Sequence, residues 1–176
     1  MNFDYKVLLG LLAVFISLPG YVIYIRNTLS GKTKPQFYSW LIWAVLAGIG
    51  YSSQIVSNAG PGSWVTGVTV LGCGVIAVLA LFKGDMHLSG VDKVLLGLSS
   101  IAVLLRVLTD NPLEALILAV GAALVGYVFT SKKAYSNPQQ ETVITYVLNS
   151  VKFFPSLFAL STVSKLTFIY PFSMLL

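Results

Sequence analysis

Charged residues are scarce in this sequence of 176 residues, since only 10% are Asp, Glu, Lys or Arg while 56% are hydrophobic. Soluble domains carry about 25% charged residues, because their surface must be hydrated. So few charges cannot cover the surface of a soluble domain of this length. The sequence therefore predicts an all-α protein embedded in a lipid bilayer, and a very apolar soluble helical bundle is the less favoured alternative.

Cysteine and histidine each occur only once, as Cys73 and His87. A single cysteine excludes an internal disulfide and a cysteine-based metal site. Cys73 lies between two glycines in an apolar run, where a buried thiol is expected. The sequence also has no pair of carboxylates inside an apolar segment, no Gly-rich phosphate loop and no zinc-ligand spacing. We therefore expect that the protein is not an enzyme and holds no metal or cofactor.

Long apolar segments fill most of the chain and are separated by short breaks that combine Gly or Pro with polar residues. A bilayer core needs about 20 apolar residues per helix. The sequence predicts seven transmembrane helices, at about 6–25, 37–57, 63–82, 90–109, 112–131, 142–159 and 161–176. The last segment is short for a full crossing, so a tilted helix or a thinned bilayer is expected there.

Positive charge gathers in alternate connections between these segments. Cytoplasmic connections are enriched in Lys and Arg, so the odd-numbered connections are expected in the cytoplasm, with the amino terminus outside and the carboxyl terminus inside. The net charge of +5 is thereby explained by membrane orientation, and no nucleic acid is expected as a partner. The residues concerned are Arg26, Lys32, Lys34, Lys83, Lys132 and Lys133.

A long-range repeat relates the two ends of the chain. Gly20-Tyr21-Val22 returns as Gly126-Tyr127-Val128, and Ser39-Trp40 returns as Thr145-Tyr146, both at an offset of 106 residues. Duplicated helical units are a common way to build a transport path through a membrane. We expect two parallel three-helix units joined by one linker helix, a 3+1+3 plan. The expected boundaries are 1–84 for the first unit, 85–110 for the linker and 111–176 for the second unit.

This plan resembles the PQ-loop superfamily, which includes the SWEET sugar transporters. The segment Pro19–Thr28, followed by Lys32 and then by Ser39-Trp40, is similar to the first PQ-loop unit, in which a helix proline precedes a short basic loop and a Ser-x-x-Trp-like helix start. The stretch Lys34–Trp43 is also similar to a group of small bacterial membrane proteins. The resemblance implies a transporter of the bacterial cytoplasmic membrane that works by rocking two helical bundles, and a homo-oligomer is compatible with it.

Polar side chains at helical spacing mark the candidate site. The sixth segment carries such a series, and under the 106-residue offset its Asn149 matches Trp43 of the second segment. An aromatic face and an amide at matching places can hold a polar, planar or sugar-like solute near the midplane. The alternative is hydrogen bonding between helices, which membrane bundles use routinely. The candidate substrate-binding residues are Trp43, Gln54, Thr145, Asn149 and Lys152.

Lys152 is the one full charge well inside a predicted span. A lysine at mid-membrane costs about 2.5–3.5 kcal/mol on insertion scales, so it usually faces a cavity or a partner. The sequence favours Glu114, in the first turn of the fifth segment, as that partner. In the alternative, the Lys152 side chain extends to the interface.

Glycine and tryptophan supply two further expectations. Glycines inside the spans are expected at close helix contacts, and aromatic residues near span ends are expected as interfacial anchors. The glycines are Gly48, Gly50, Gly67, Gly72, Gly74, Gly97, Gly121 and Gly126, and the anchors are Trp40, Trp64 and Tyr135.

The sequence thus predicts a membrane transporter that moves a small polar solute, sugar-like or vitamin-like, by alternating access between two helical bundles. No ATP site is apparent, so transport would be downhill or coupled to an ion. A vitamin-uptake permease of similar helix count belongs to the same class with another solute. The alternative from a different class is a membrane receptor or assembly subunit that transports nothing and has a packed, closed core.

Overall fold

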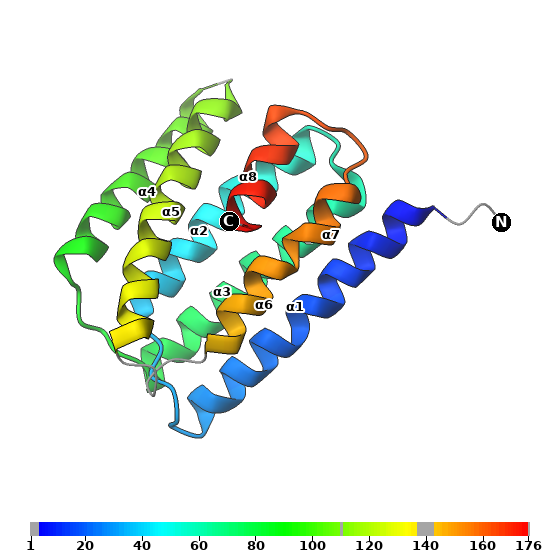
Figure 1. The fold of residues 1–176 in the computed structure, drawn as a ribbon. Helices are drawn as coiled ribbons and strands as arrows, with labels where there is room; N and C mark the ends of the chain where they lie inside the picture. The colour runs from blue at the N-terminus through cyan, green and yellow to red at the C-terminus, as the bar shows by residue number, and fades with distance from the viewer. Residues whose placement is uncertain (1–3, 110, 137–142, 176) are drawn as a thin grey trace.

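The helices form one bundle in the computed structural model, which describes residues 4–109, 111–136 and 143–175, with side chains for all of these except 129–136 and 143. No β-strand occurs in these ranges, and Gln36 and Asp85 form one isolated bridge. Figure 1 shows the helices lying side by side along a common direction. They are α1 (Tyr5–Leu29), α2 (Phe37–Val56), the short 3-10 helix η1 (Gly60–Ser63), α3 (Trp64–Lys83), α4 (Gly90–Leu108), α5 (Pro112–Ser136), α6 (Val143–Val151), α7 (Phe153–Phe158) and α8 (Lys165–Leu175).

Side-chain caps set where the helices at one end of the bundle begin. Gln36 caps α2, since its side chain accepts a hydrogen bond from a backbone N–H in the first turn. Ser89 and Asp92 form a reciprocal capping box at the start of α4, which satisfies two amide groups that would otherwise lack partners. The first and third connections also lie together, because the Phe37 N–H donates to the Asp85 carbonyl at 3.0 Å. These contacts fix the end of the bundle that carries most of the cationic connections.

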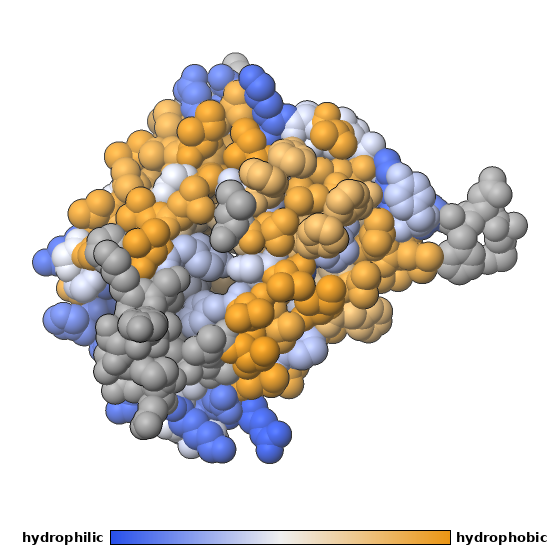
Figure 2. Space-filling model, viewed as in Figure 1, coloured by the Kyte–Doolittle hydropathy of each residue, from blue (hydrophilic) through white to orange (hydrophobic). Residues whose placement is uncertain are grey.

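Three of the described helices are long and apolar enough to cross a membrane, namely Tyr5–Leu29, Phe37–Val56 and Gly60–Lys83. Figure 2 shows a broad hydrophobic surface between more hydrophilic ends, and many large apolar side chains on it are exposed. In water such a surface would be unfavourable, whereas lipid chains cover it at no cost. These are the features of an all-α membrane protein.

The packing order of the helices is the same in both halves of the chain. In the first half, α3 packs against both α1 and α2; in the second half, α8 packs against both α5 and α7. Between the halves, α1 packs against α6 and α7, while α2 packs against α5. Helix α4 covers α2 and α5. In Figure 1, α1 and α5 run in the same direction, and α2 and α6 run in the opposite direction.

The sixth predicted span is interrupted. Helix α6 ends at Val151, Lys152 adopts a turn, and α7 begins at Phe153. Pro155 explains the break, because its ring has no N–H to donate and clashes with the carbonyl four residues earlier, which belongs to Val151. Lys152 therefore lies where the regular series of helical backbone hydrogen bonds is interrupted.

The last helix, α8, contains 11 residues, which is about 16 Å at 1.5 Å per residue. A bilayer core of about 30 Å needs nearly twice that length. Its end lies about midway along the bundle in Figure 1. Beside this end, between α5 and α6, the surface in Figure 2 is hollowed and lined by residues of intermediate polarity.

The interfacial-anchor prediction is wrong for Trp40. Its ring is only 2% exposed and its Nε1 donates to the Tyr24 hydroxyl at 3.2 Å, so it belongs to the interior. The α2 helix begins at Phe37, and Trp40 therefore lies one turn inside the helix on its buried face. Trp64 is 39% exposed at the start of α3, as an anchor should be. Tyr135 lies outside the residues whose side chains are described.

Candidate functional site: a buried lysine on an aromatic cavity

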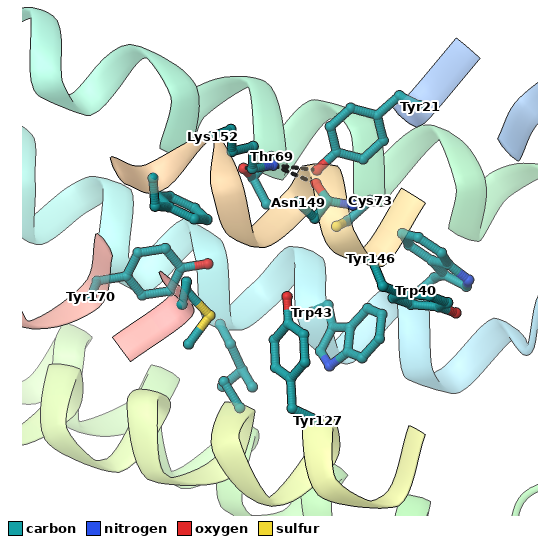
Figure 3. Close-up of a pocket in the computed structure, with 14 residues that line it drawn as sticks. Tyr21, Trp40, Trp43, Thr69, Cys73, Tyr127, Tyr146, Asn149, Lys152 and Tyr170 are labelled. Atoms are coloured by element: carbon teal, nitrogen blue, oxygen red, sulfur yellow. Dashed lines mark hydrogen bonds between the residues drawn. The ribbon is translucent and has the colours of Figure 1, made fainter. Parts of the chain in front are cut away.

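Lys152 lies in the interior of the bundle with a side chain that is 0% exposed. Its Nζ donates to the Tyr21 hydroxyl at 3.0 Å, to Thr69 Oγ1 at 2.8 Å and to Asn149 Oδ1. Figure 3 shows these four side chains converging from α1, α3 and the α6–α7 segment. The ammonium also lies 4.8 Å from the centre of the Tyr21 ring and 5.2 Å from that of Phe153.

Two of these neighbours can only accept from the lysine. Thr69 gives its own hydroxyl proton to the Val65 carbonyl at 2.7 Å, so its oxygen accepts, and Asn149 Oδ1 has no proton to give. All the acceptors are neutral, and among the described side chains no carboxylate forms an ion pair with Lys152. Its hydrogen bonds are therefore satisfied while its charge lacks a counter-ion.

The predicted partner of Lys152 is therefore wrong. Glu114 Oε1 instead accepts from Asn111 Nδ2 at 3.3 Å in the loop that joins α4 to α5. The snorkelling alternative is also wrong, because a lysine that reached the interface would be exposed, whereas Lys152 is fully buried. The sequence placed Lys152 within the sixth predicted segment, but it gave no information on which helices face its side chain.

A small cavity adjoins the Lys152 cluster between the two halves of the bundle. The space for the centres of water molecules is about 30 Å³, and by this measure one water needs about 10–15 Å³. The cavity therefore has room for two or three waters in this conformation. In Figure 3, the hydroxyls of Tyr127 and Tyr170 point toward its interior. Its walls are Tyr21, Trp40, Trp43, Leu46, Thr69, Cys73, Ala123, Tyr127, Tyr146, Asn149, Lys152, Phe153, Tyr170 and Met174.

Trp43 holds the aromatic part of this wall together. Its ring is stacked on Tyr127, with centroids 5.3 Å apart and planes at 20°. It meets Trp40 edge-on at 5.3 Å and Tyr146 edge-on at 6.0 Å. Such offset and edge-to-face arrangements stabilise aromatic pairs by about 0.5–1.5 kcal/mol beyond their burial. Trp43 therefore links α2 to α5 and α6.

Trp43 also borders a second, larger cavity of about 380 Å³ at the end of the bundle that carries the first and third connections. Polar groups line this outer cavity. Asp92 is 7% exposed and accepts from Gln36 Nε2 at 3.1 Å and from Ser89 Oγ at 2.6 Å. Trp43 is the residue that the walls of the outer cavity and of the cavity containing Lys152 have in common.

Residues at the spacing of the predicted repeat occur together in the walls of the inner cavity. Four pairs of positions at an offset of 106 residues both line it. Equivalent places in the two halves therefore face the same space. The pairs are Tyr21 with Tyr127, Trp40 with Tyr146, Trp43 with Asn149, and Leu46 with Lys152.

The five sequence-predicted site residues divide into two groups. Trp43, Asn149 and Lys152 lie on the inner cavity. Thr145 and Gln54 are fully buried and lie away from it, since Thr145 Oγ1 donates to the Gly20 carbonyl at 3.0 Å and Gln54 Nε2 donates to the Thr167 carbonyl at 3.2 Å. Both of these contacts are hydrogen bonds between helices, the structural role that membrane bundles commonly give to such residues.

Sequence reasoning missed several of the cavity residues. Tyr21 and Tyr127 were already visible as members of the repeat, and that signal was sufficient to place them at equivalent positions. Thr69 carried no such signal, because a single threonine in an apolar helix is common. Tyr170 belongs to the short α8, whose position depends on tertiary packing.

Among the residues that the structure describes, no group of three or more His, Cys, Asp or Glu side chains is arranged to hold a metal ion. Comparison of the chain with models of known protein families, with curated proteins and with solved structures finds no match.

Proposed function

We propose that this protein transports a small polar solute across the membrane by alternating access between two three-helix units. The first unit is α1–α3 and the second is α5–α8, with α6 and α7 together taking the place of one helix. Helix α4 links the units, which gives the 3+1+3 plan of seven helices. The solute binds in the inner cavity, where the two units meet.

The observation that carries this proposal is the pairing of cavity positions. Residues 106 positions apart face one space from opposite units, as in the pair Trp43 and Asn149. A duplicated unit whose copies meet at a polar cavity is the architecture in which rocking of one copy against the other opens the cavity alternately to the two sides. The reciprocal packing of α1 on α6–α7 and of α2 on α5 further supports it.

Under this proposal, the structure represents a conformation in which the inner cavity is closed. The inner cavity is too small for a solute larger than a few waters, and the outer cavity shares the Trp43 side chain with it as a wall residue. Movement of the α2–α5 contact, where Trp43 stacks on Tyr127, would join the two cavities. This places the proposed entry path at the end with the first and third connections.

The proposed orientation follows from the same end of the bundle. The first connection and the helix end before it carry Arg26, Lys32 and Lys34, and Lys83 ends α3 nearby. The positive-inside rule then assigns this end to the cytoplasm, with the amino terminus outside and the carboxyl terminus inside. A bacterial cytoplasmic membrane is the proposed location, in keeping with the resemblance to PQ-loop proteins.

The test is a ligand screen followed by transport. Purified full-length protein is screened by thermal shift against sugars, nucleosides, vitamins, amino acids and organic acids, and each hit is tested for uptake into proteoliposomes. We expect at least one hit to be transported, and Asn149→Ala to weaken its binding, since a lost or unsatisfied hydrogen bond at a buried amide costs about 1–3 kcal/mol. Binding and uptake that are both unchanged in Asn149→Ala would place the site elsewhere.

A non-transporting receptor or assembly subunit is the second candidate, and the small volume of the inner cavity favours it. In that case the aromatic cluster around Trp43 is a permanent packing contact. The distinguishing measurement is accessibility of Cys73, which lies on the inner cavity wall. A transporter exposes this thiol periodically to a small membrane-impermeant reagent, whereas a closed scaffold does not.

A further inference from the structure

We propose that the transported solute is a small organic monoanion, in which a carboxylate is attached to a flat or apolar body, and that Lys152 supplies its counter-charge. This inference rests on the proposed transport function and specifies its substrate class. It follows from three features of the inner cavity, which are its charge, its hydrogen-bond donors and its aromatic walls.

The charge of the cavity is unbalanced. Lys152 is the only charged residue among the described residues that line it, and its three hydrogen-bond acceptors are neutral. A buried ammonium in a membrane is unfavourable unless an anion compensates it. A bound carboxylate supplies one negative charge, so the occupied site becomes neutral. A dianion would leave an excess negative charge, and a neutral solute would leave the ammonium uncompensated.

The cavity is also rich in donors that suit a carboxylate. Asn149 directs its Oδ1 to Lys152, which leaves its amide nitrogen as a donor with two protons. The hydroxyls of Tyr127 and Tyr170 point into the same space. An ionised carboxylate accepts hydrogen bonds only, so these groups can hold it, while the nearby ammonium supplies the opposite charge.

The remaining walls suit the body of such a molecule. Half of the lining residues are aromatic, and Trp43 and Tyr127 present nearly parallel rings at 5.3 Å. Flat apolar groups stack on such rings, whereas a sugar would need many more side-chain hydrogen bonds than this cavity provides. The aromatic lining residues are Tyr21, Trp40, Trp43, Tyr127, Tyr146, Phe153 and Tyr170.

Benzoate and benzamide form the matched pair that tests the inference, because they differ in charge and hardly in shape. Binding of each to purified full-length protein is measured by isothermal calorimetry in detergent and by uptake into proteoliposomes. We expect benzoate to bind at least tenfold more tightly than benzamide. Lys152→Met should abolish this preference, while Lys165→Met, which removes an exposed lysine of α8, should preserve it.

Asn149→Asp provides a second variant that keeps the shape of the site. It places a carboxylate in hydrogen-bond contact with the Lys152 ammonium, so the protein then carries its own counter-ion. We expect benzoate affinity to fall at least tenfold while the melting temperature stays the same or rises. Asn111→Asp, in an exposed loop, is the matched control and should leave benzoate binding unchanged.

The outcomes separate this inference from the transport proposal. If benzoate binds as expected and no benzoate or other hit is taken up, the anion site stands and transport fails. If a neutral solute is taken up and Asn149→Asp leaves its uptake unchanged, transport stands and the anion inference is overturned. Failure of benzoate to bind the wild-type protein, or equal affinity for benzoate and benzamide, overturns the anion inference directly.

Discussion

Gly72 offers the sharpest test of the packing that holds the Lys152 cluster. A Cβ atom at this position would lie 2.5 Å from the Tyr21 ring, far inside van der Waals contact. The Tyr21 ring is 5% exposed and its hydroxyl accepts from Lys152. Gly72→Ala therefore has to displace the ring and with it one of the three acceptors of the ammonium.

The size of the effect follows from two contributions. Overpacking a filled interior costs about 1–3 kcal/mol, and loss of the Lys152–Tyr21 hydrogen bond adds about 1 kcal/mol. Alanine also gains about 1 kcal/mol over glycine in a helix. Gly74→Ala is the control, since it gains the same helix propensity and its Cβ meets nothing within 4 Å. The free energy of unfolding should therefore differ between the two variants by about 2–4 kcal/mol.

The assay is reversible unfolding of both variants by an SDS titration in mixed micelles, followed by far-ultraviolet circular dichroism. Tyr21→Phe is measured in parallel, because it removes only the hydroxyl and keeps the ring. We expect Gly74→Ala to be at least as stable as the wild type. Among the three variants, Gly72→Ala should be the least stable. Equal stability of the two alanine variants would refute the assigned contact between α1 and α3.

Three further predictions concern orientation, gating and the outer cavity. In a Cys73→Ser background, Lys34→Cys should resist an impermeant thiol reagent added outside intact cells; labelling from outside would reverse the proposed orientation. Trp43→Ala should increase the rate at which Cys73 reacts with a small thiosulfonate in proteoliposomes, because Trp43 lines both cavities and loss of its ring should connect them; an unchanged rate would contradict a gating role for Trp43. Asp92→Ala should lower the free energy of unfolding by about 1–2 kcal/mol through loss of the α4 capping box, whereas Lys93→Ala, at an exposed position, should change it by less than about 0.5 kcal/mol.

The first five helices could be predicted from the sequence, because glycine, proline and polar residues end each apolar run. The prediction of 37–57 compares with Phe37–Val56, and that of 90–109 compares with Gly90–Leu108. The last two predicted spans agree less well with the observed helices. Hydropathy averages over a window and does not register Pro155, which interrupts the sixth segment, or the late start of α8 at Lys165.

Residues that share one helix face were found more easily than residues that face each other. The spacing of Asn149 and Lys152 placed both on one face of the sixth segment, and the structure joins them by a hydrogen bond. Tyr21 and Thr69 come from α1 and α3, and no periodicity within a single helix indicates that these faces meet. The wrong prediction that Glu114 is the partner of Lys152 has the same cause, because the sequence does not show which helix faces Lys152.

The glycines also show that the sequence does not reveal which helix faces meet. All eight span glycines were expected at close contacts, yet only some are. A Cβ at Gly50 would lie 2.5 Å from the Tyr170 ring, and one at Gly67 would lie 3.1 Å from Tyr51. At half of the eight, an added Cβ would meet nothing within 4 Å. Open space surrounds Gly48, Gly74, Gly97 and Gly121, while Gly72 and Gly126 are close to other residues.

If the two halves are the repeated units of the proposed transporter, the paired cavity positions suit an asymmetric solute. In a symmetric dimer of one unit, the position of Lys152 would carry lysine twice, and two ammoniums in a cavity of about 30 Å³ would repel each other strongly. In this chain the matching position is Leu46, and the position that matches Asn149 is Trp43. At these two pairs of positions, one side supplies the charge and the amide while the other supplies an apolar and an aromatic side chain. On the proposed mechanism, this difference leaves one ammonium in the cavity instead of two, which suits a solute with a single charged end, while aromatic side chains from both units remain available for its flat body.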